Sequence, residues 1–134
     1  MDVSINIWAV LVSGVLHWIV GALWYSPVLF GKPWAELMKL DMSSDEEGPS
    51  VLLYLGGLIV GIVMAAGLAL LLSLTGTTAI PAAIAIALIA WLAFTAAPAF
   101  ANAIFGGSVP LWAINNAYPL VTAVLMSVIL TVWR

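Results

Sequence analysis

The chain contains few side chains that are able to take part in chemistry. His17 is its one histidine, and it lies in an apolar stretch beside Trp18. An imidazole in that setting can relay protons, bind the metal of a haem- or chlorophyll-type pigment, or donate to a backbone carbonyl. A bis-histidine haem needs a second histidine, which the sequence lacks. The sequence therefore favours the hydrogen-bonding role and predicts no bound cofactor, with pigment or cofactor binding through His17 as the alternative.

A second group of polar side chains gathers toward one end of the apolar stretches. Its members are Tyr25, Ser26, Asn102, Asn115, Asn116 and Tyr118. Pro27, Pro98 and Pro119 lie among them, and a proline inside a helix leaves the carbonyl four residues earlier without its usual partner. This combination predicts a polar pocket or shallow vestibule. The same groups can also hold helices together at about 0.6 kcal/mol per hydrogen bond, so both interpretations stand.

Other functional classes find little support. The chain has no cysteine, and its acidic residues lie outside the apolar stretches. No glycine-rich phosphate loop follows a strand, and the apolar stretches lack the charged residues of ion-coupled transporters. The net charge is −3 and no basic patch exists, which argues against nucleic acid as a partner. We expect a protein that is not an enzyme and has no metal site.

Four apolar stretches must position these side chains. They cover about residues 5–29, 51–74, 79–104 and 111–133 of the 134 residues. Each reaches roughly the 20 residues that an α-helix needs to cross ~30 Å of hydrocarbon. The chain is 65% hydrophobic and 7% charged, whereas soluble domains carry about 25% charged residues. The sequence predicts an all-α integral membrane four-helix bundle, one domain over residues 1–134, with the lipid bilayer as its main partner.

Four crossings place both termini on one side of the membrane. Interfacial aromatic residues agree, because Trp8 and Trp133 then mark that side. The opposite side is marked by Trp24, Tyr25, Trp34, Tyr54, Trp112 and Tyr118. Lys32 and Lys39 lie on this opposite side, and positive-inside counting makes it cytoplasmic. We therefore predict termini that are not cytoplasmic.

The connection between the first two helices has a structure of its own. The sequence Gly31-Lys32-Pro33 is expected to end the first helix. Trp34, Leu37 and Met38 then share one face of a short interfacial amphipathic segment, for which an irregular loop anchored by Trp34 is the alternative. Farther on, Ser44 and Glu47 have the spacing of a capping box. The acidic run at residues 45–47 is expected to be a solvated charge cluster.

Small residues recur every four positions in the second helix. They are Gly57, Gly61, Ala65, Ala69 and Ser73. Such a stripe lets membrane helices approach closely, and its partner is either another helix of this chain or a second copy. Ala93, Ala97 and Ala101 repeat the device in the third helix. The stripe favours a non-enzymatic protein that acts through helix packing, as a homo-oligomer or an accessory subunit of a larger membrane complex. A small channel or carrier for a neutral or weakly polar solute is the alternative.

Two stretches carry a resemblance to a known family. Residues 21–27 read Gly-Ala-Leu-Trp-Tyr-Ser-Pro and are followed by Phe30-Gly31-Lys32-x-Trp34, while residues 114–118 read Ile-Asn-x-Ala-Tyr. In these stretches the chain resembles a family of small bacterial four-helix membrane proteins that is classed as a domain of unknown function. The resemblance implies a four-helix bundle in the bacterial inner membrane. It implies no reaction.

Overall fold

The computed structural model describes residues 2–39 and 51–134, and this part of the chain is helical. The predictions for Ser44, Glu47 and the run at 45–47 lie outside the described residues. Four helices are long and apolar enough to cross a membrane. They are α1 (Ile7–Trp24), α3 (Val51–Leu74), a third span built from α4 (Ile80–Trp91), η1 (Leu92–Ala96) and α5 (Ala97–Phe105), and α6 (Val109–Val132). The prediction of a multi-pass membrane protein with a helical fold is confirmed.

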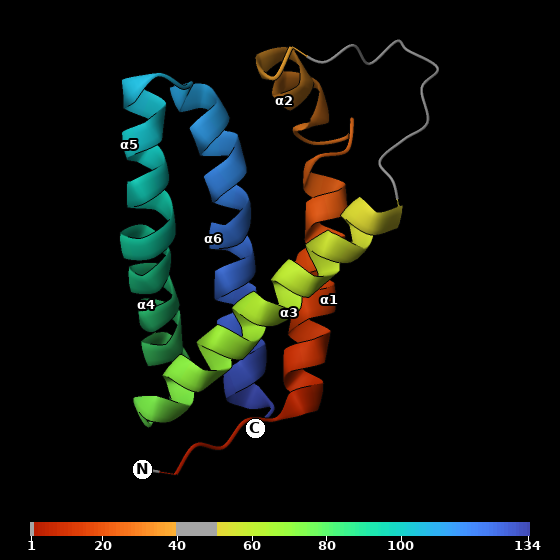
Figure 1. The fold of residues 1–134 in the computed structure, drawn as a ribbon. Helices are drawn as coiled ribbons and strands as arrows, with labels where there is room; N and C mark the ends of the chain where they lie inside the picture. The colour runs from red at the N-terminus through yellow and green to blue at the C-terminus, as the bar shows by residue number, and fades with distance from the viewer. Residues whose placement is uncertain (1, 40–50) are drawn as a thin grey trace.

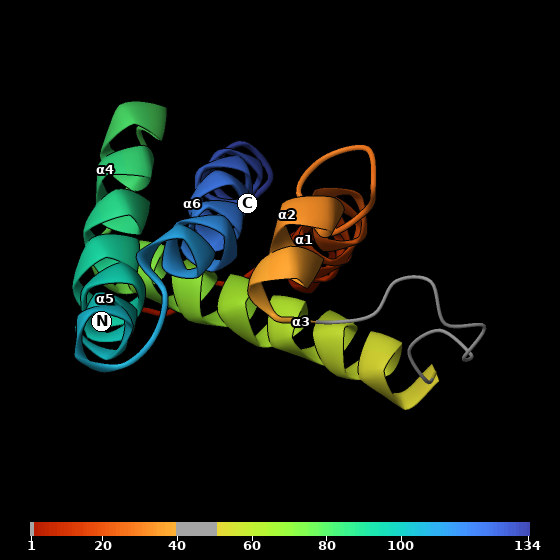
Figure 2. The ribbon, with the colours of Figure 1, turned by 90° about the horizontal axis from the view of Figure 1, so that it is seen from above.

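The helices form one layer of three spans crossed by a fourth. The helices α1, α6 and α4–α5 stand side by side with α6 in the middle, and α3 runs diagonally across one face of this layer (Figures 1 and 2). Both termini lie at the same end of the bundle, and the short helix α2 (Gly31–Leu37) lies at the other (Figure 1). The core where α3 crosses the layer contains Ala9, Ala65, Ala69 and Met126. Small side chains there keep the helices close together.

The first helix ends at Trp24, five residues earlier than predicted. Pro27 has no N–H to offer to the carbonyl of Leu23. Ser26 takes that place, since its backbone N–H and its hydroxyl donate to Leu23 O at 3.2 and 2.6 Å. The prediction that Gly31-Lys32-Pro33 ends the first helix is wrong, because these residues open α2 instead.

The short helix predicted in the first connection is present as α2. Gly31 and Ala35 are buried, Trp34 is half-buried and Met38 is exposed. A Cβ atom on Gly31 would lie 2.5 Å from the backbone oxygen of Tyr25. The close return of the chain after α1 therefore requires glycine at this position.

The third span contains a π-helical segment, η1. The N–H of Ala97 donates to Leu92 O, five residues back, and the next residue, Pro98, has no N–H. One π-turn inserts an extra residue and rotates the helix that follows by about 100°. The face that packs into the bundle therefore changes register within the span.

The small-residue face predicted for the third helix does not pack within this chain. Ala93, Ala97 and Ala101 are all exposed. The alanines buried in this span are Ala83, Ala87, Ala96 and Ala103. Of the two partners that the prediction allows for Ala93, Ala97 and Ala101, a second copy of the chain therefore remains.

Candidate functional site

The glycine stripe of α3 packs on α1 of the same chain. A Cβ atom on Gly61 would lie 2.6 Å from Gly14 O, and one on Gly14 would lie 2.9 Å from Ile62 Cα. Ala65 and Ala69 are buried along the same face. At the two ends of the stripe, Gly57 faces Trp18, and Ser73 Oγ accepts a hydrogen bond from Ser4 N at 2.9 Å. Of the two partners that the sequence left open for the stripe, this structure places a helix of the same chain on it.

His17 is buried between α1 and α6. Its Nδ1 lies 2.8 Å from Thr122 Oγ1, and its ring stacks on Tyr118 with the centroids 4.5 Å apart. The Tyr118 hydroxyl donates to His17 O at 2.6 Å. Gly21 makes room for that phenol, because a Cβ atom there would lie 2.6 Å from the hydroxyl oxygen. The imidazole thus makes a structural hydrogen bond, and its partner is a side-chain hydroxyl where the sequence favoured a backbone carbonyl.

Thr122 connects the imidazole to the α6 backbone. Its hydroxyl lies 3.3 Å from both Tyr118 O and Pro119 O. A hydroxyl that donates to one of these carbonyls, as threonine in helices commonly does, keeps a lone pair for an N–H at Nδ1 of His17. The proline at 119 thus lies beside the polar contact between the two helices.

An aromatic cluster closes the junction of α1, α2 and α6. It consists of Trp24, Tyr25, Phe30, Trp34 and Tyr118, with ring centroids 4.6–6.3 Å apart. The Tyr25 hydroxyl donates to Asn115 Oδ1 at 2.9 Å, and Trp24 Nε1 donates to Ile114 O at 2.9 Å. Burial raises the pKa of Tyr25 above its ordinary value, so the phenol keeps the proton that it donates. The cluster fastens α1 to α6 at the end of the bundle that carries α2.

Two more indoles fasten the other side of α6. Trp91 Nε1 donates to Asn116 O at 2.8 Å, and Trp112 Nε1 donates to Ala96 O at 3.0 Å. Both contacts join α6 to the third span. The contact at Asn116 O lies close to Pro119 in sequence, and the contact at Ala96 O lies within η1. Neither contact was predicted from the sequence. Trp91 lies near the middle of an apolar stretch, away from the interface that tryptophan prefers. This unusual position is the one feature of the sequence that indicates a contact of the indole inside the bundle.

The structure divides the six residues of the predicted polar pocket among several places. Tyr25, Asn115 and Tyr118 meet at the aromatic cluster. Asn116 points to another side of α6, where its Nδ2 donates to Trp112 O at 2.8 Å. Adjacent residues of a helix point about 100° apart, which explains why Asn115 and Asn116 separate.

The remaining two residues of that set lie elsewhere. Ser26 donates within its own turn, to Leu23 O. Asn102 is exposed on α5, because the π-turn has rotated this part of the span. Within the described residues, the six side chains do not surround a common cavity.

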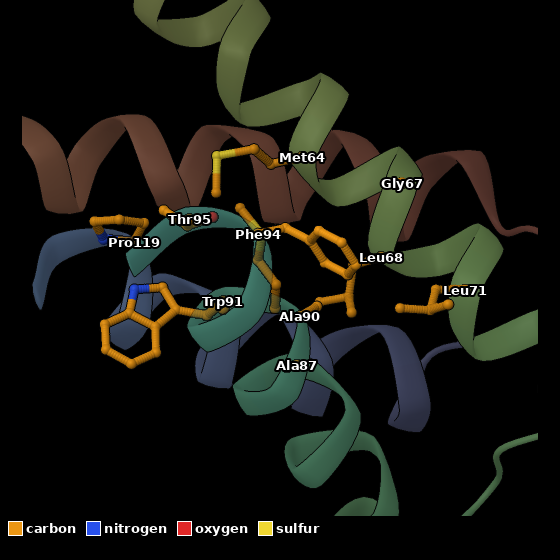
Figure 3. A pocket seen from close by; sticks show the side chains of 12 residues that line it. Met64, Gly67, Leu68, Leu71, Ala87, Ala90, Trp91, Phe94, Thr95 and Pro119 are labelled. Atoms are coloured by element: carbon orange, nitrogen blue, oxygen red, sulfur yellow. The ribbon is translucent and has the colours of Figure 1, made fainter. Parts of the chain in front are cut away.

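A cavity of about 230 Å³ lies elsewhere, between α3, α4, η1 and α6 (Figure 3). Its wall is formed by Met64, Gly67, Leu68, Leu71, Ala87, Ala90, Trp91, Phe94, Thr95, Pro119, Ala123 and Met126. Ten of these residues have neither a hydroxyl nor a polar ring nitrogen, and the indole N–H of Trp91 is already donated to Asn116 O. The wall is therefore apolar, with Thr95 as its one hydroxyl.

Comparison with known proteins places the chain in a family. No curated protein and no solved structure matches it significantly. One family model matches over residues 8–131. This range includes the stretches at 21–27 and 114–118. It also covers all four spans, apart from the first residue of α1 and the last residue of α6. The chain belongs to the family described as Protein of unknown function (DUF1761).

Proposed function

We propose that this membrane protein acts through helix packing, as a homo-oligomer or as an accessory subunit of a larger membrane complex, and not as an enzyme. The first half of α3 carries the proposal. It extends beyond α1 at the edge of the three-helix layer (Figure 2). Leu55 and Ile59 are 50% and 60% exposed there. Among the described residues, no atom beyond its own turn of helix lies within 4 Å of where a Cβ of Gly56 would stand. A protruding apolar helix with a glycine on its surface is suited to packing against another membrane helix.

The polar groups of the bundle support the same proposal. His17, Tyr25 and Tyr118 each make a hydrogen bond to α6 or α1 that holds the bundle together. A carrier for a polar solute would need Asn102, Asn115 and Asn116 along one path, and these three residues lie on different sides of their helices. The carrier alternative therefore has less support than the packing proposal.

Cysteine cross-linking tests the proposal directly, because the chain has no cysteine of its own. Leu55→Cys and Ile59→Cys place a thiol on the protruding half of α3, and Ile89→Cys places one on α4, where Ile89 is 65% exposed. We expect oxidation in native membranes to cross-link the two α3 variants to a second copy or to another subunit, and the Ile89 variant to remain uncross-linked. The size of the product separates the homo-oligomer from the accessory subunit.

A mass measurement in mild detergent completes this test. The proposal predicts a complex larger than one chain. A monomeric mass, together with no cross-link from either α3 variant, would reject it.

A further inference from the structure

The cavity between α3 and α4 opens onto the lateral surface of the bundle. Phe94 and Gly67 both line it, and both are exposed. Phe94 is 83% exposed and lies within the third span, while Gly67 lies within α3. The opening therefore faces the hydrocarbon that surrounds these two spans and is continuous with their lipid-exposed surface.

The packing of α3 explains why this space exists. The helix α3 packs on α1 through Gly61 and Ala65 and crosses the layer diagonally (Figure 1). On the cavity side, the facing walls carry Gly67 on α3 and Ala87 and Ala90 on α4 (Figure 3). In the part of the chain that the structure describes, no atom beyond its own turn of helix lies within 4 Å of where a Cβ of Gly67 would stand. Small residues on both walls thus leave a space that larger side chains would fill.

The chemistry of the wall selects an apolar occupant. A polar solute would give up its hydrogen bonds to water and find almost no replacement. An empty space would deprive the lining atoms of dispersion contacts. An apolar cavity of roughly 150 Å³ is already large enough to bind benzene, and this one has about 230 Å³. A flexible hydrocarbon segment of several methylene groups fits these requirements.

We propose that the cavity holds part of an acyl chain of a membrane phospholipid, which enters between α3 and α4 past Phe94. Acyl chains are the molecules that border its opening, and they match its apolar wall. This proposal is independent of the packing proposed for the first half of α3, since none of the residues that carry the latter lines the cavity.

Native mass spectrometry of protein extracted from its membrane in mild detergent tests the proposal. Gly67→Phe fills the cavity, whereas Ala85→Phe places the same ring on an exposed position of α4 outside it. Ala85 also lies outside the surface proposed for packing on another chain. We expect the unchanged protein and the Ala85 variant to retain one phospholipid per chain. In the Gly67 variant this retention should fall about tenfold, because the ring takes up the volume of the chain.

A second variant and a labelling experiment make the outcome decisive. Ala90→Leu fills the cavity from the opposite wall and should lower phospholipid retention in the same way, whether or not the Gly67 variant folds. A phospholipid with a photoreactive group on its acyl chain, reconstituted with the unchanged protein, should label the α3 and α4 walls of the cavity. Equal retention in both cavity variants and the control would overturn the proposal. Retention of an isoprenoid in place of phospholipid, or cross-linking of a second protein chain into the cavity, would overturn it as well.

Discussion

Nδ1 of His17 lies 2.8 Å from Oγ1 of Thr122, although 105 residues separate the two in sequence. The contact joins α1 to α6 in the interior of the bundle, where both residues are buried. Hydrocarbon offers no water to replace either partner. The pair is therefore the polar contact on which we expect the assembly of these two helices to depend most.

Thr122→Val keeps the shape of the side chain and removes its hydroxyl. The imidazole then loses its partner while it stays buried, and the expected loss of stability is about 1–2 kcal/mol. Unfolding in mixed detergents, followed by circular dichroism, measures this loss. Thr122→Ser keeps the hydroxyl, and its free energy of unfolding should lie close to that of the unchanged protein. Equal stability of the valine and serine variants would show that the contact contributes nothing.

The close approach of α1 and α3 gives a second prediction. Gly61→Ala adds a Cβ atom that would lie 2.6 Å from Gly14 O, a backbone atom that moves only with its helix. The two helices must separate, and we expect a loss of about 1–3 kcal/mol. Gly56→Ala is the control, because within residues 2–39 and 51–134 no atom beyond its own turn of helix lies within 4 Å of its Cβ position. It should leave stability unchanged or raise it by up to about 1 kcal/mol through its better helix propensity. Similar unfolding free energies for the two variants would contradict the packing described for Gly61.

The indole of Trp112 gives a third prediction. Trp112→Phe removes the donor to Ala96 O, which lies 3.0 Å from the indole nitrogen. The variant keeps an aromatic ring against Phe100, whose centroid lies 4.8 Å from that of Trp112 in the unchanged protein. We expect a loss of about 0.6–1.7 kcal/mol and faster amide hydrogen exchange after η1. Trp133→Phe, at an exposed position, is the matched control. Exchange that is unchanged in the Trp112 variant would mean that the indole does not stabilise η1.

The arrangement of the spans predicts the sidedness of the chain. Ser4→Cys and Arg134→Cys lie near the two termini, which share one end of the bundle, and Lys32→Cys lies in α2 at the other end (Figure 1). A membrane-impermeant maleimide should react with the first two thiols from the same side and with the third from the opposite side. Positive-inside counting predicts that the side of Lys32 is the cytoplasm. Reaction of positions 4 and 134 from opposite sides would refute a four-span arrangement in the membrane.

The aromatic cluster contains the part of the predicted pocket that residue types and positions predicted correctly. Tyr25, Asn115 and Tyr118 share the α2 end of their helices, and this shared depth is the reason why they were predicted to lie together. They do meet in the structure. Asn102 belonged to the same group, but the π-turn at residues 92–96 directs it out of the bundle. Depth along a helix can be estimated by counting residues, whereas direction around the helix changes with a single inserted residue.

The cavity, by contrast, could not be predicted from the sequence. Gly67, Ala87 and Ala90 form no motif, and their side chains carry no chemistry that a sequence pattern would single out. The cavity exists because α3 crosses the layer at an angle (Figure 1) and because both walls carry small residues there. That angle results from packing between helices that are distant in sequence.

The sequence by itself determined that this is a membrane protein with four helical spans. The cost of placing charge or unpaired backbone groups in hydrocarbon applies to each segment separately, whatever its neighbours are. The tertiary structure alone decided that the glycine stripe packs on α1, that Thr122 is the partner of His17, and that α3 and α4 leave a space between them. These features depend on crossing angles and helix rotation, which arise from many weak contacts made at the same time between distant parts of the chain.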